Sequence, residues 1–317
     1  MAVYIFQPVY QRRIWGGQHL RTLFGREIPE GETIGESWEL VDRLEAQSTG
    51  ILLGSEGSMT LHELWTGPER GRIFGSAAPS TDRFPILIKI LDATDKLSLQ
   101  VHPDARLAAL LKGEPKTEMW YFLHTEPDAV IYAGLKRGVT RTSFKKAVED
   151  KTVAQCFHCL KVARGEAILL PSGRVHGIGA GNVIWEVQQN SDTTFRVDDW
   201  DRVDSSGKPR KLHVEQALTC IHFEDQEPTL AQPHGERLIS TDFFETRRNE
   251  FFDKETREIR VDPRSFLYVF VSRGSFAFAG YEWKSGSSAL FSADTGAVEV
   301  TALTEEAELL LASFPLN

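Results

Sequence analysis

One stretch, from Phe84 to Trp120, constrains the fold more than any other part of the chain. It begins with the apolar run FPILIKILDA and continues into LSLQVHPD, where Ser98, Gln100 and His102 stand at every second position. Successive side chains of a β-strand point to opposite faces, so we expect these three to share one face. Glu118 follows, after an expected short helix, at the head of a second apolar run, MWYFL. The pattern predicts neighbouring strands that carry Gln100, His102 and Glu118 as candidate ligands of one metal ion.

A fourth candidate ligand, His176, lies near the end of the segment GEAILLPSGRVHGIG. Gly165 and Gly173 allow positive φ and Pro171 fixes the start of a turn, so the segment predicts a strand, a turn and a second strand. The spacing from Gly165 to His176 resembles the second cupin motif, although Ala180 stands where that motif ends in Asn. In the first cupin motif a His-x-His pair is usual, whereas here Gln100 replaces the first His. The resemblance implies a β-barrel with His176 aimed at its interior.

Four motifs in order resemble the type I mannose-6-phosphate isomerases, namely Gln-x-His-Pro-Asp, Lys-x-Glu-x-Trp, the Pro-x-Gly-x-x-His turn and SDTTFRVDDWDR. The resemblance covers most of residues 1–220. It includes IWGG at residues 14–17 and IGESWEL at residues 34–40, which are typical of the short bacterial form. It implies one zinc ion per chain, with the ligands Gln100, His102, Glu118 and His176.

The same resemblance implies that Ser98, Lys116, Asp192 and Arg196 line an active site. Lys116 precedes Glu118 by two residues, so strand alternation places both side chains on one face. The planar fork of an Arg such as Arg196 suits the oxyanions of a sugar phosphate. We expect Lys116, Asp192 and Arg196 to act in catalysis, with either Asp192 or Lys116 moving the proton, and Ser98, Lys116 and Arg196 to bind substrate. The alternative for Lys116 is an ordinary surface lysine, and the alternative for Asp192 and Arg196 is a structural salt bridge.

The expected reaction follows from this set of residues. Two nitrogen and two oxygen ligands suit zinc, and also iron, manganese or cobalt. Turning an aldose into a ketose moves a proton between C2 and C1 while an oxygen gains negative charge, which requires a base and an electrophile. We therefore expect a metal-dependent isomerase that interconverts mannose 6-phosphate and fructose 6-phosphate. The alternatives are an iron-dependent cupin oxygenase, which Gln100 disfavours, and a non-catalytic sugar-binding cupin.

Composition excludes several other classes of protein. The 317 residues are 41% hydrophobic and 26% charged, which is enough apolar material for a large core. A net charge of -9 disfavours a nucleic-acid partner, and no apolar run has the roughly 20 residues that a membrane helix needs. Three cysteines fit a reducing compartment, so we expect a cytoplasmic protein. The expected partner is a small-molecule sugar phosphate, and no feature specifies the number of subunits.

The fold class predicted from the whole chain is mainly β, with two cupin-type β-barrels (jelly rolls) and a few short helices. We expect an N-terminal catalytic cupin domain with helical insertions over residues 1–225 and a degenerate cupin domain over residues 236–317. The polar, Pro-bearing segment between them predicts a linker. The segment from Gly286 to Ala297 aligns without a gap on Gly165 to His176, with alanine at the histidine position. The second barrel is therefore expected to bind no catalytic metal.

Two further clusters are interpreted as structural. Cys156 and Cys159 form a Cys-x-x-Cys, but we expect them on opposite faces of a strand, as buried cysteines without a metal. The acidic cluster Asp198, Asp199 and Asp201 lacks the glycine and terminal Glu of a calcium loop, so we expect a solvated loop.

Overall fold

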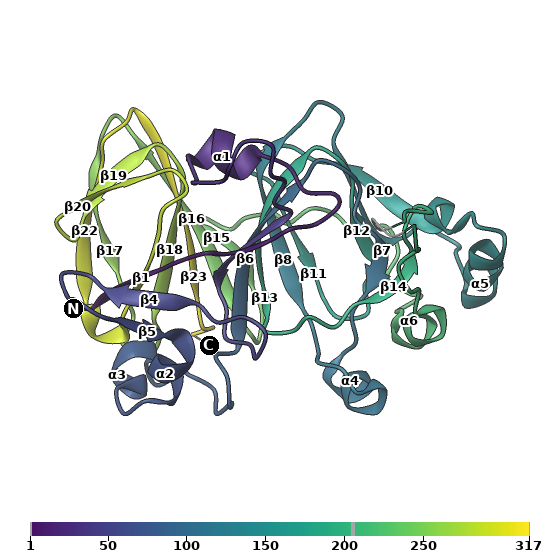
Figure 1. Cartoon of the computed structure of the whole chain (residues 1–317), viewed down its shortest axis with the longest axis horizontal. Helices are drawn as coiled ribbons and strands as arrows, with labels where there is room; N and C mark the ends of the chain where they lie inside the picture. The colour runs from purple at the N-terminus through teal and green to yellow at the C-terminus, as the bar shows by residue number, and fades with distance from the viewer. Residues whose placement is uncertain (1, 204–206, 317) are drawn as a thin grey trace.

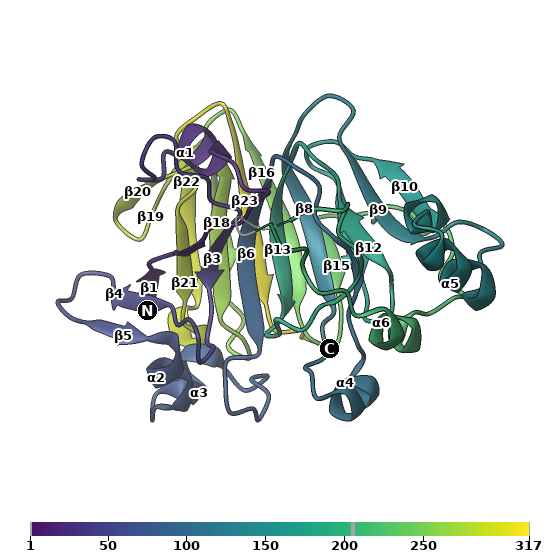
Figure 2. The ribbon, with the colours of Figure 1, turned by 45° about the vertical axis from the view of Figure 1, so that its right-hand side comes forward.

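The computed structural model describes residues 2–203 and 207–316, whose strands form two barrels that lie side by side (Figures 1 and 2). The first barrel consists of two facing sheets. The larger sheet has the order β11-β8-β13-β6-β3-β2 and the smaller one β10-β9-β12-β7-β14. The strands of the larger sheet are β2 (Val9–Gln11), β3 (Glu36–Leu40), β6 (Ile86–Ala93), β8 (Glu118–Thr125), β11 (Ala167–Leu170) and β13 (Asn182–Gln189). Those of the smaller sheet are β7 (Leu99–Val101), β9 (Val130–Leu135), β10 (Phe157–Lys161), β12 (His176–Ile178) and β14 (Phe195–Asp198).

The second barrel also has two sheets, with the orders β15-β16-β23-β18-β21-β1-β4-β5 and β17-β22-β19-β20. The strands of its larger sheet are β1 (Val3–Phe6), β4 (Thr49–Leu52), β5 (Ser58–Thr60), β15 (Arg237–Ser240), β16 (Glu245–Phe252), β18 (Leu267–Arg273), β21 (Ser288–Phe291) and β23 (Glu306–Ser313). Those of its smaller sheet are β17 (Thr256–Arg260), β19 (Ser275–Phe278), β20 (Tyr281–Lys284) and β22 (Ala297–Ala302). The prediction of a mainly β fold with two barrels is confirmed.

The beginning of the chain belongs to the sheet of the second barrel. Strand β1 pairs antiparallel with β21, with Val3 opposite Phe291 and Tyr4 opposite Leu290. Strand β4 then pairs with β1, and β5 with β4. These pairings show that N-terminal strands complete the C-terminal barrel. The division into domains at residues 1–225 and 236–317 stays a prediction.

The largest apolar cluster lies between the two barrels. On β6 every second residue contributes to it, so Ile88 lies in the same cluster as Tyr268 and Phe270 of β18. The alternate side chains, Lys89 and Leu91, point into the first barrel. Both faces of this sheet are therefore buried, which explains why the sequence of β6 is nearly all apolar.

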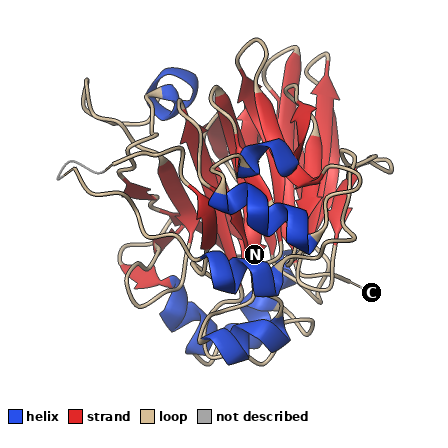
Figure 3. Cartoon of the chain, turned by 90° about the vertical axis from the view of Figure 1, so that its right-hand side faces the viewer, coloured by secondary structure: helices blue, strands red, loops and turns tan. Residues whose placement is uncertain are grey.

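Helices lie outside the strands, and Figure 3 shows several of them at one end of the molecule. They are α1 (His19–Phe24), α2 (Leu61–Thr66), α3 (Arg70–Phe74), α4 (Ala105–Leu111), α5 (Arg141–Glu149) and α6 (Val214–Cys220). The expected short helix before Glu118 is α4, where the Asp104 carboxylate accepts a hydrogen bond of 2.7 Å from the backbone N–H of Leu107. Within the described ranges, no helix has the length and apolar character needed to cross a membrane.

Two expectations from the sequence are wrong. Cys156 is buried in a short 3₁₀ turn before β10, but Cys159 is exposed, because β10 is an edge strand with one face toward solvent. Of the three aspartates expected in a solvated loop, Asp201 is exposed, but the expectation is wrong for Asp199. It is buried and accepts hydrogen bonds from Arg202 and Arg210, with the latter's Nε at 2.7 Å.

Candidate metal centre and substrate pocket

Three of the predicted ligands meet in the first barrel. His102 follows β7, Glu118 opens β8 and His176 opens β12, and all three side chains are buried. Glu118 Oε2 lies 3.6 Å from His102 Nε2, and Glu118 Oε1 lies 3.3 Å from His176 Nε2. The ligand atoms of all three residues lie within 4.8 Å of one another, a separation that one ion can bridge.

Backbone carbonyls orient both imidazoles. His102 Nδ1–H donates to the carbonyl oxygen of Thr193 at 2.8 Å, and His176 Nδ1–H donates to that of Arg174 at 2.9 Å. With the proton on Nδ1, each Nε2 presents a lone pair to the centre. Burial lowers the pKa of His102 well below its ordinary value and that of His176 to about 4, so both rings are neutral near pH 7. Neutral imidazoles with a fixed tautomer are suited to bind a metal.

The centre contains two buried acceptors without a donor. Within the described structure, no hydrogen bond reaches His102 Nε2 or Glu118 Oε1, whereas the Lys116 ammonium lies 2.8 Å from Glu118 Oε2. Buried polar atoms normally have a partner, and leaving them unpaired costs free energy. Because the two Nε2 atoms and the carboxylate converge as electron-pair donors, the residues present fit a cation.

Gln100 is the fourth residue at the centre. It lies opposite His176 in the antiparallel pair of β7 and β12, and its Nε2 is 3.3 Å from His176 Nε2. The Ser98 hydroxyl donates to Gln100 Oε1 at 3.0 Å. Rotation of the amide by 180° exchanges its oxygen and nitrogen, after which Oε1 faces the histidines and the Ser98 oxygen accepts from the amide nitrogen. Gln100 is therefore placed to supply a neutral oxygen ligand.

A row of buried charges continues from the centre along the barrel wall. Lys116 Nζ lies 2.8 Å from Glu118 Oε2. Although burial favours the neutral amine, the negative charges of Glu118 and Glu186 raise the pKa of Lys116, which stays protonated at neutral pH. Lys89 Nζ lies 3.6 Å from Glu186 and 3.4 Å from Glu36. Alternating positive and negative groups thus compensate one another inside the barrel.

Glu36 is the most strongly paired carboxylate of this row. Burial alone would raise its pKa, but the charges of Lys89 and Arg13 and a hydrogen bond from Trp38 lower it to about 2. Arg13 Nε lies 2.7 Å from Glu36 Oε1. Burial raises the pKa of Glu186, whose carboxylate also accepts a hydrogen bond of 3.0 Å from Trp120 Nε1.

A cavity of about 440 Å³ opens beside these residues. Its lining includes six of the predicted site residues, Ser98, Gln100, Lys116, His176, Asp192 and Arg196. His102 and Glu118 do not line it, but Glu118 contacts Lys116 and His176, and the His102 ring centroid lies 4.7 Å from that of His176. The structure thus brings all eight predicted site residues to one place, while their individual roles stay predictions.

Basic groups gather around the same cavity. Arg12, Arg13, Arg196 and Arg210 all line it, in a chain whose net charge is -9. Burial and the neighbouring charge of Arg210 lower the pKa of Arg196, and the Nε of Arg196 has no hydrogen-bond partner in the described structure. Asp199 holds Arg210 through hydrogen bonds to both of its carboxylate oxygens. The cavity therefore offers free N–H donors and positive charge to an anion.

Sequence reasoning did not single out Glu36, Lys89, Glu186, Arg13 or Arg210. Lys89 and Glu186 each stand alone within an apolar strand, in ILIKILDA and NVIWEVQQ. A charge in a strand that is buried on both faces is costly unless it is paired, so this pattern was a usable signal. Arg13 and Arg210 lie in polar loops, where the sequence carries no comparable signal.

Comparison with known proteins identifies relatives of this chain. A family profile described as phosphomannose isomerase type I, catalytic domain, matches residues 3–131. Mannose-6-phosphate isomerase ManA of Bacillus subtilis (strain 168) is 38% identical over 244 residues, which is 76% of this chain and 75% of that protein.

Solved structures share the fold of this chain over nearly its whole length. The crystal structure of the mannose 6-phosphate isomerase from Bacillus subtilis superposes with a TM-score of 0.85 at 26% identity, covering 98% of this chain and 99% of that one. A structure described as mannose 6-phosphate isomerase bound with zinc and yttrium shares the fold, with a TM-score of 0.76 at 16% identity over 100% of both chains. The chain therefore belongs to the type I mannose-6-phosphate isomerase family, and it is an aldose–ketose isomerase that interconverts mannose 6-phosphate and fructose 6-phosphate.

Proposed function

We propose that this isomerase holds one zinc ion per chain through Gln100, His102, Glu118 and His176. The observation that carries the proposal is the convergence of His102 Nε2 and His176 Nε2 on the Glu118 carboxylate, at 3.6 Å and 3.3 Å, with no hydrogen-bond partner for His102 Nε2 or Glu118 Oε1 in the described structure. A structural neighbour is described as bound with zinc, which supports the choice of metal. When bound, zinc supplies Lewis acidity to sugar oxygens in the adjoining cavity.

We propose that the arginines of the cavity bind the sugar phosphate. Arg196 has a free Nε in the described structure, and its fork provides paired donors for a phosphate or a developing oxyanion. The buried Lys116 ammonium is held beside Glu118 and donates to an oxygen at C1 or C2. These cations orient an anionic substrate and stabilise negative charge as it forms.

Proton transfer is assigned to Asp192 in this proposal. Lys116 is paired and protonated, so it lacks the lone pair that a base needs. The Asp192 carboxylate lines the same cavity, and we assign it the role of the base. It removes the proton from C2, leaving an enediolate with its negative charge on O1. O1 gains the proton that O2 loses, and the protonated Asp192 returns its proton to C1, so that neither oxidant nor water is consumed. Neither alternative function, an oxygenase or a non-catalytic binding protein, is favoured by the comparisons.

A coupled assay of fructose 6-phosphate formation separates the metal from the acid–base group. Metal-free protein is expected to be inactive and to recover on addition of zinc. The variant Asp192→Asn is expected to keep its zinc but to lose turnover by about 10²–10⁴-fold, the usual contribution of a general base. Full activity in verified metal-free protein would refute the metal site, and full activity in Asp192→Asn would refute the assigned base.

We also propose that the enzyme works in the cytoplasm. All three cysteines are free in the structure, and one of them, Cys159, is exposed. Such thiols are typical of a reducing compartment.

A further inference from the structure

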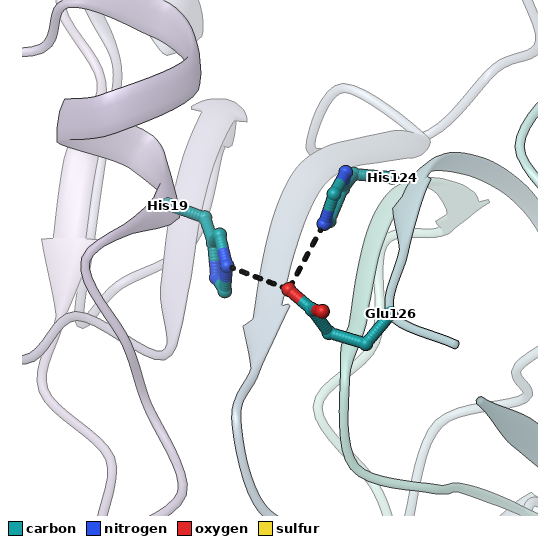
Figure 4. A group of neighbouring side chains, drawn as sticks. All are labelled: His19, His124 and Glu126. Carbon is teal, nitrogen blue, oxygen red and sulfur yellow. Dashed lines mark hydrogen bonds and ion pairs between the residues drawn. The ribbon is translucent and has the colours of Figure 1, made fainter. Parts of the chain in front are cut away.

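A second cluster of metal-ligating side chains lies outside the catalytic pocket (Figure 4). His19 opens α1, His124 is the last but one residue of β8, and Glu126 follows that strand. Glu126 Oε1 lies 3.2 Å from His124 Nε2 and 3.8 Å from His19 Nε2. The ligand atoms of the three residues lie within 4.8 Å of one another, and none of them lines the cavity.

A buried carboxylate fixes the orientation of His19. Asp92, near the end of β6, accepts hydrogen bonds of 2.7 Å from His19 Nδ1 and 2.7 Å from the His19 backbone N–H. The Asp92 side chain is fully buried, so its position is set by the barrel. The result is a carboxylate–histidine pair with Nε2 of the ring directed toward Glu126, the arrangement that supports metal-bound histidines in proteins.

We propose that His19, His124 and Glu126 bind a divalent transition-metal ion, with zinc as the best candidate. Ligands of a tetrahedral zinc ion with bonds of about 2.0–2.1 Å stand about 3.4 Å apart, close to the two distances around Glu126 Oε1. Two imidazoles favour zinc and its transition-metal neighbours over calcium or magnesium. The side chains of His19, His124 and Glu126 are 23%, 35% and 52% exposed, so water completes the coordination.

The proposed ion ties the N-terminal segment to the first barrel. Residues 12–15, which shortly precede His19, line the catalytic cavity. The Thr94 hydroxyl donates to the carbonyl oxygens of Trp15 and Gly16 at 3.1 Å and 2.8 Å, and His19 is bound to Asp92, so the segment is already attached to β6 and the residue that follows it. A metal bridge from His19 to His124 and Glu126 adds an attachment to β8 and restrains one wall of the pocket. The site is weaker than the catalytic centre because it has fewer protein ligands and is open to solvent.

Zinc titration of the holoenzyme tests the site. Isothermal calorimetry in a Cys159→Ser background, which removes the exposed thiol, is expected to show one equivalent of zinc beyond the catalytic ion. His124→Gln and Glu126→Gln are each expected to weaken binding of that equivalent by at least tenfold. Asp92→Asn is expected to weaken it by roughly 10–100-fold, the usual cost of losing a supporting carboxylate.

His62→Gln is the matched control. His62 Nδ1 lies 3.1 Å from Asp42, so it is also a carboxylate–histidine pair, but it belongs to no three-ligand cluster of the described residues. This variant is expected to bind the extra equivalent as the parent does. A parent that binds no extra zinc, or a His124→Gln variant that binds it unchanged, would overturn the proposal.

Hydrogen exchange gives an independent readout. Excess zinc is expected to slow amide exchange over residues 12–24 in the parent holoenzyme and in His62→Gln, but not in His124→Gln. Equal exchange with and without zinc in the parent would show that no bridge forms.

Discussion

At the scale of single residues, the pocket contains several buried charges, each of which is stabilised by an oppositely charged neighbour. Lys116 lies against Glu118, and Lys89 lies between Glu36 and Glu186. Removing a charge from water costs several kcal/mol, and removal of one partner leaves the other uncompensated. These residues therefore contribute to stability and to the electrostatics of catalysis at the same time.

Arg196 is expected to act on the substrate more than on the fold, because its Nε has no partner in the described structure. Arg196→Lys keeps a positive charge but loses the planar fork. We expect kcat/KM to fall on the order of a hundredfold with little change in melting temperature. Steady-state kinetics and thermal melts check this, and a variant that unfolds or works normally would assign the residue a structural or neutral role.

Glu36 is expected to make stability depend on pH. Its pKa is about 2 in the folded chain against an ordinary 4.5, so the folded state favours the ionised carboxylate. This stabilisation is complete above about pH 4.5 and is lost as the pH falls toward about 2. Glu36→Gln lacks this stabilisation. The parent should therefore exceed the variant in unfolding free energy at pH 6, and this excess should be roughly 2 kcal/mol smaller at pH 3.

Urea unfolding at the two pH values measures this difference. Glu56→Gln, a substitution at an exposed position, is the control and should differ from the parent equally at both pH values. A Glu36→Gln variant whose difference from the parent is also constant would contradict the lowered pKa.

At the scale of elements, short strands position the proposed ligands. Strand β7 contains only Leu99–Val101, and its alternation places Gln100 against His176 of β12. Alternation of residues, one turn motif and the family resemblance predicted the candidate ligand set, and the internal repeat predicted the two-barrel architecture, of which the architecture is confirmed. They did not predict that β1 joins the second barrel, since that pairing joins residues nearly 290 positions apart. The charges of Lys89 and Glu186 were visible in the sequence, but only the sheet register shows that they meet.

The turn before β12 depends on Gly173, which has a φ of +89°. A Cβ at this position would lie 2.5 Å from the His222 ring, and the Gly173 N–H donates to the carbonyl oxygen of His102. We expect Gly173→Ala to displace both histidine ligands and to lower zinc content and melting temperature.

Gly296→Ala is the matched control for that substitution. Gly296 has a φ of +76° in the corresponding turn of the second barrel, with open space around it. The Gly296→Ala variant should lose about 1–3 kcal/mol of stability from the strain of a left-handed backbone at alanine, and it should keep its zinc. Zinc analysis of the two purified variants distinguishes them, and equal zinc content would argue against a special role for the Gly173 turn.

At the scale of the whole molecule, one architecture occurs twice but, among the described residues, only the first copy carries the candidate ligands. Gly286 and Gly165 both have φ near +90°, and Ala297 opens β22 as His176 opens β12. Ala297 is exposed and has no donor atom. The second barrel instead packs its larger sheet against the first barrel through the main apolar cluster. Because only the first barrel offers these ligands, we predict a single tightly bound metal ion in each chain.

The zinc content of dialysed protein tests the central claim most directly. After dialysis at low free zinc, which empties the exposed site at His19, the parent is expected to retain one zinc ion per chain. His176→Ala, with its fold verified by circular dichroism, is expected to retain far less than one and to lose isomerase activity. Two tightly held ions in the parent, or one retained by His176→Ala, would contradict the account.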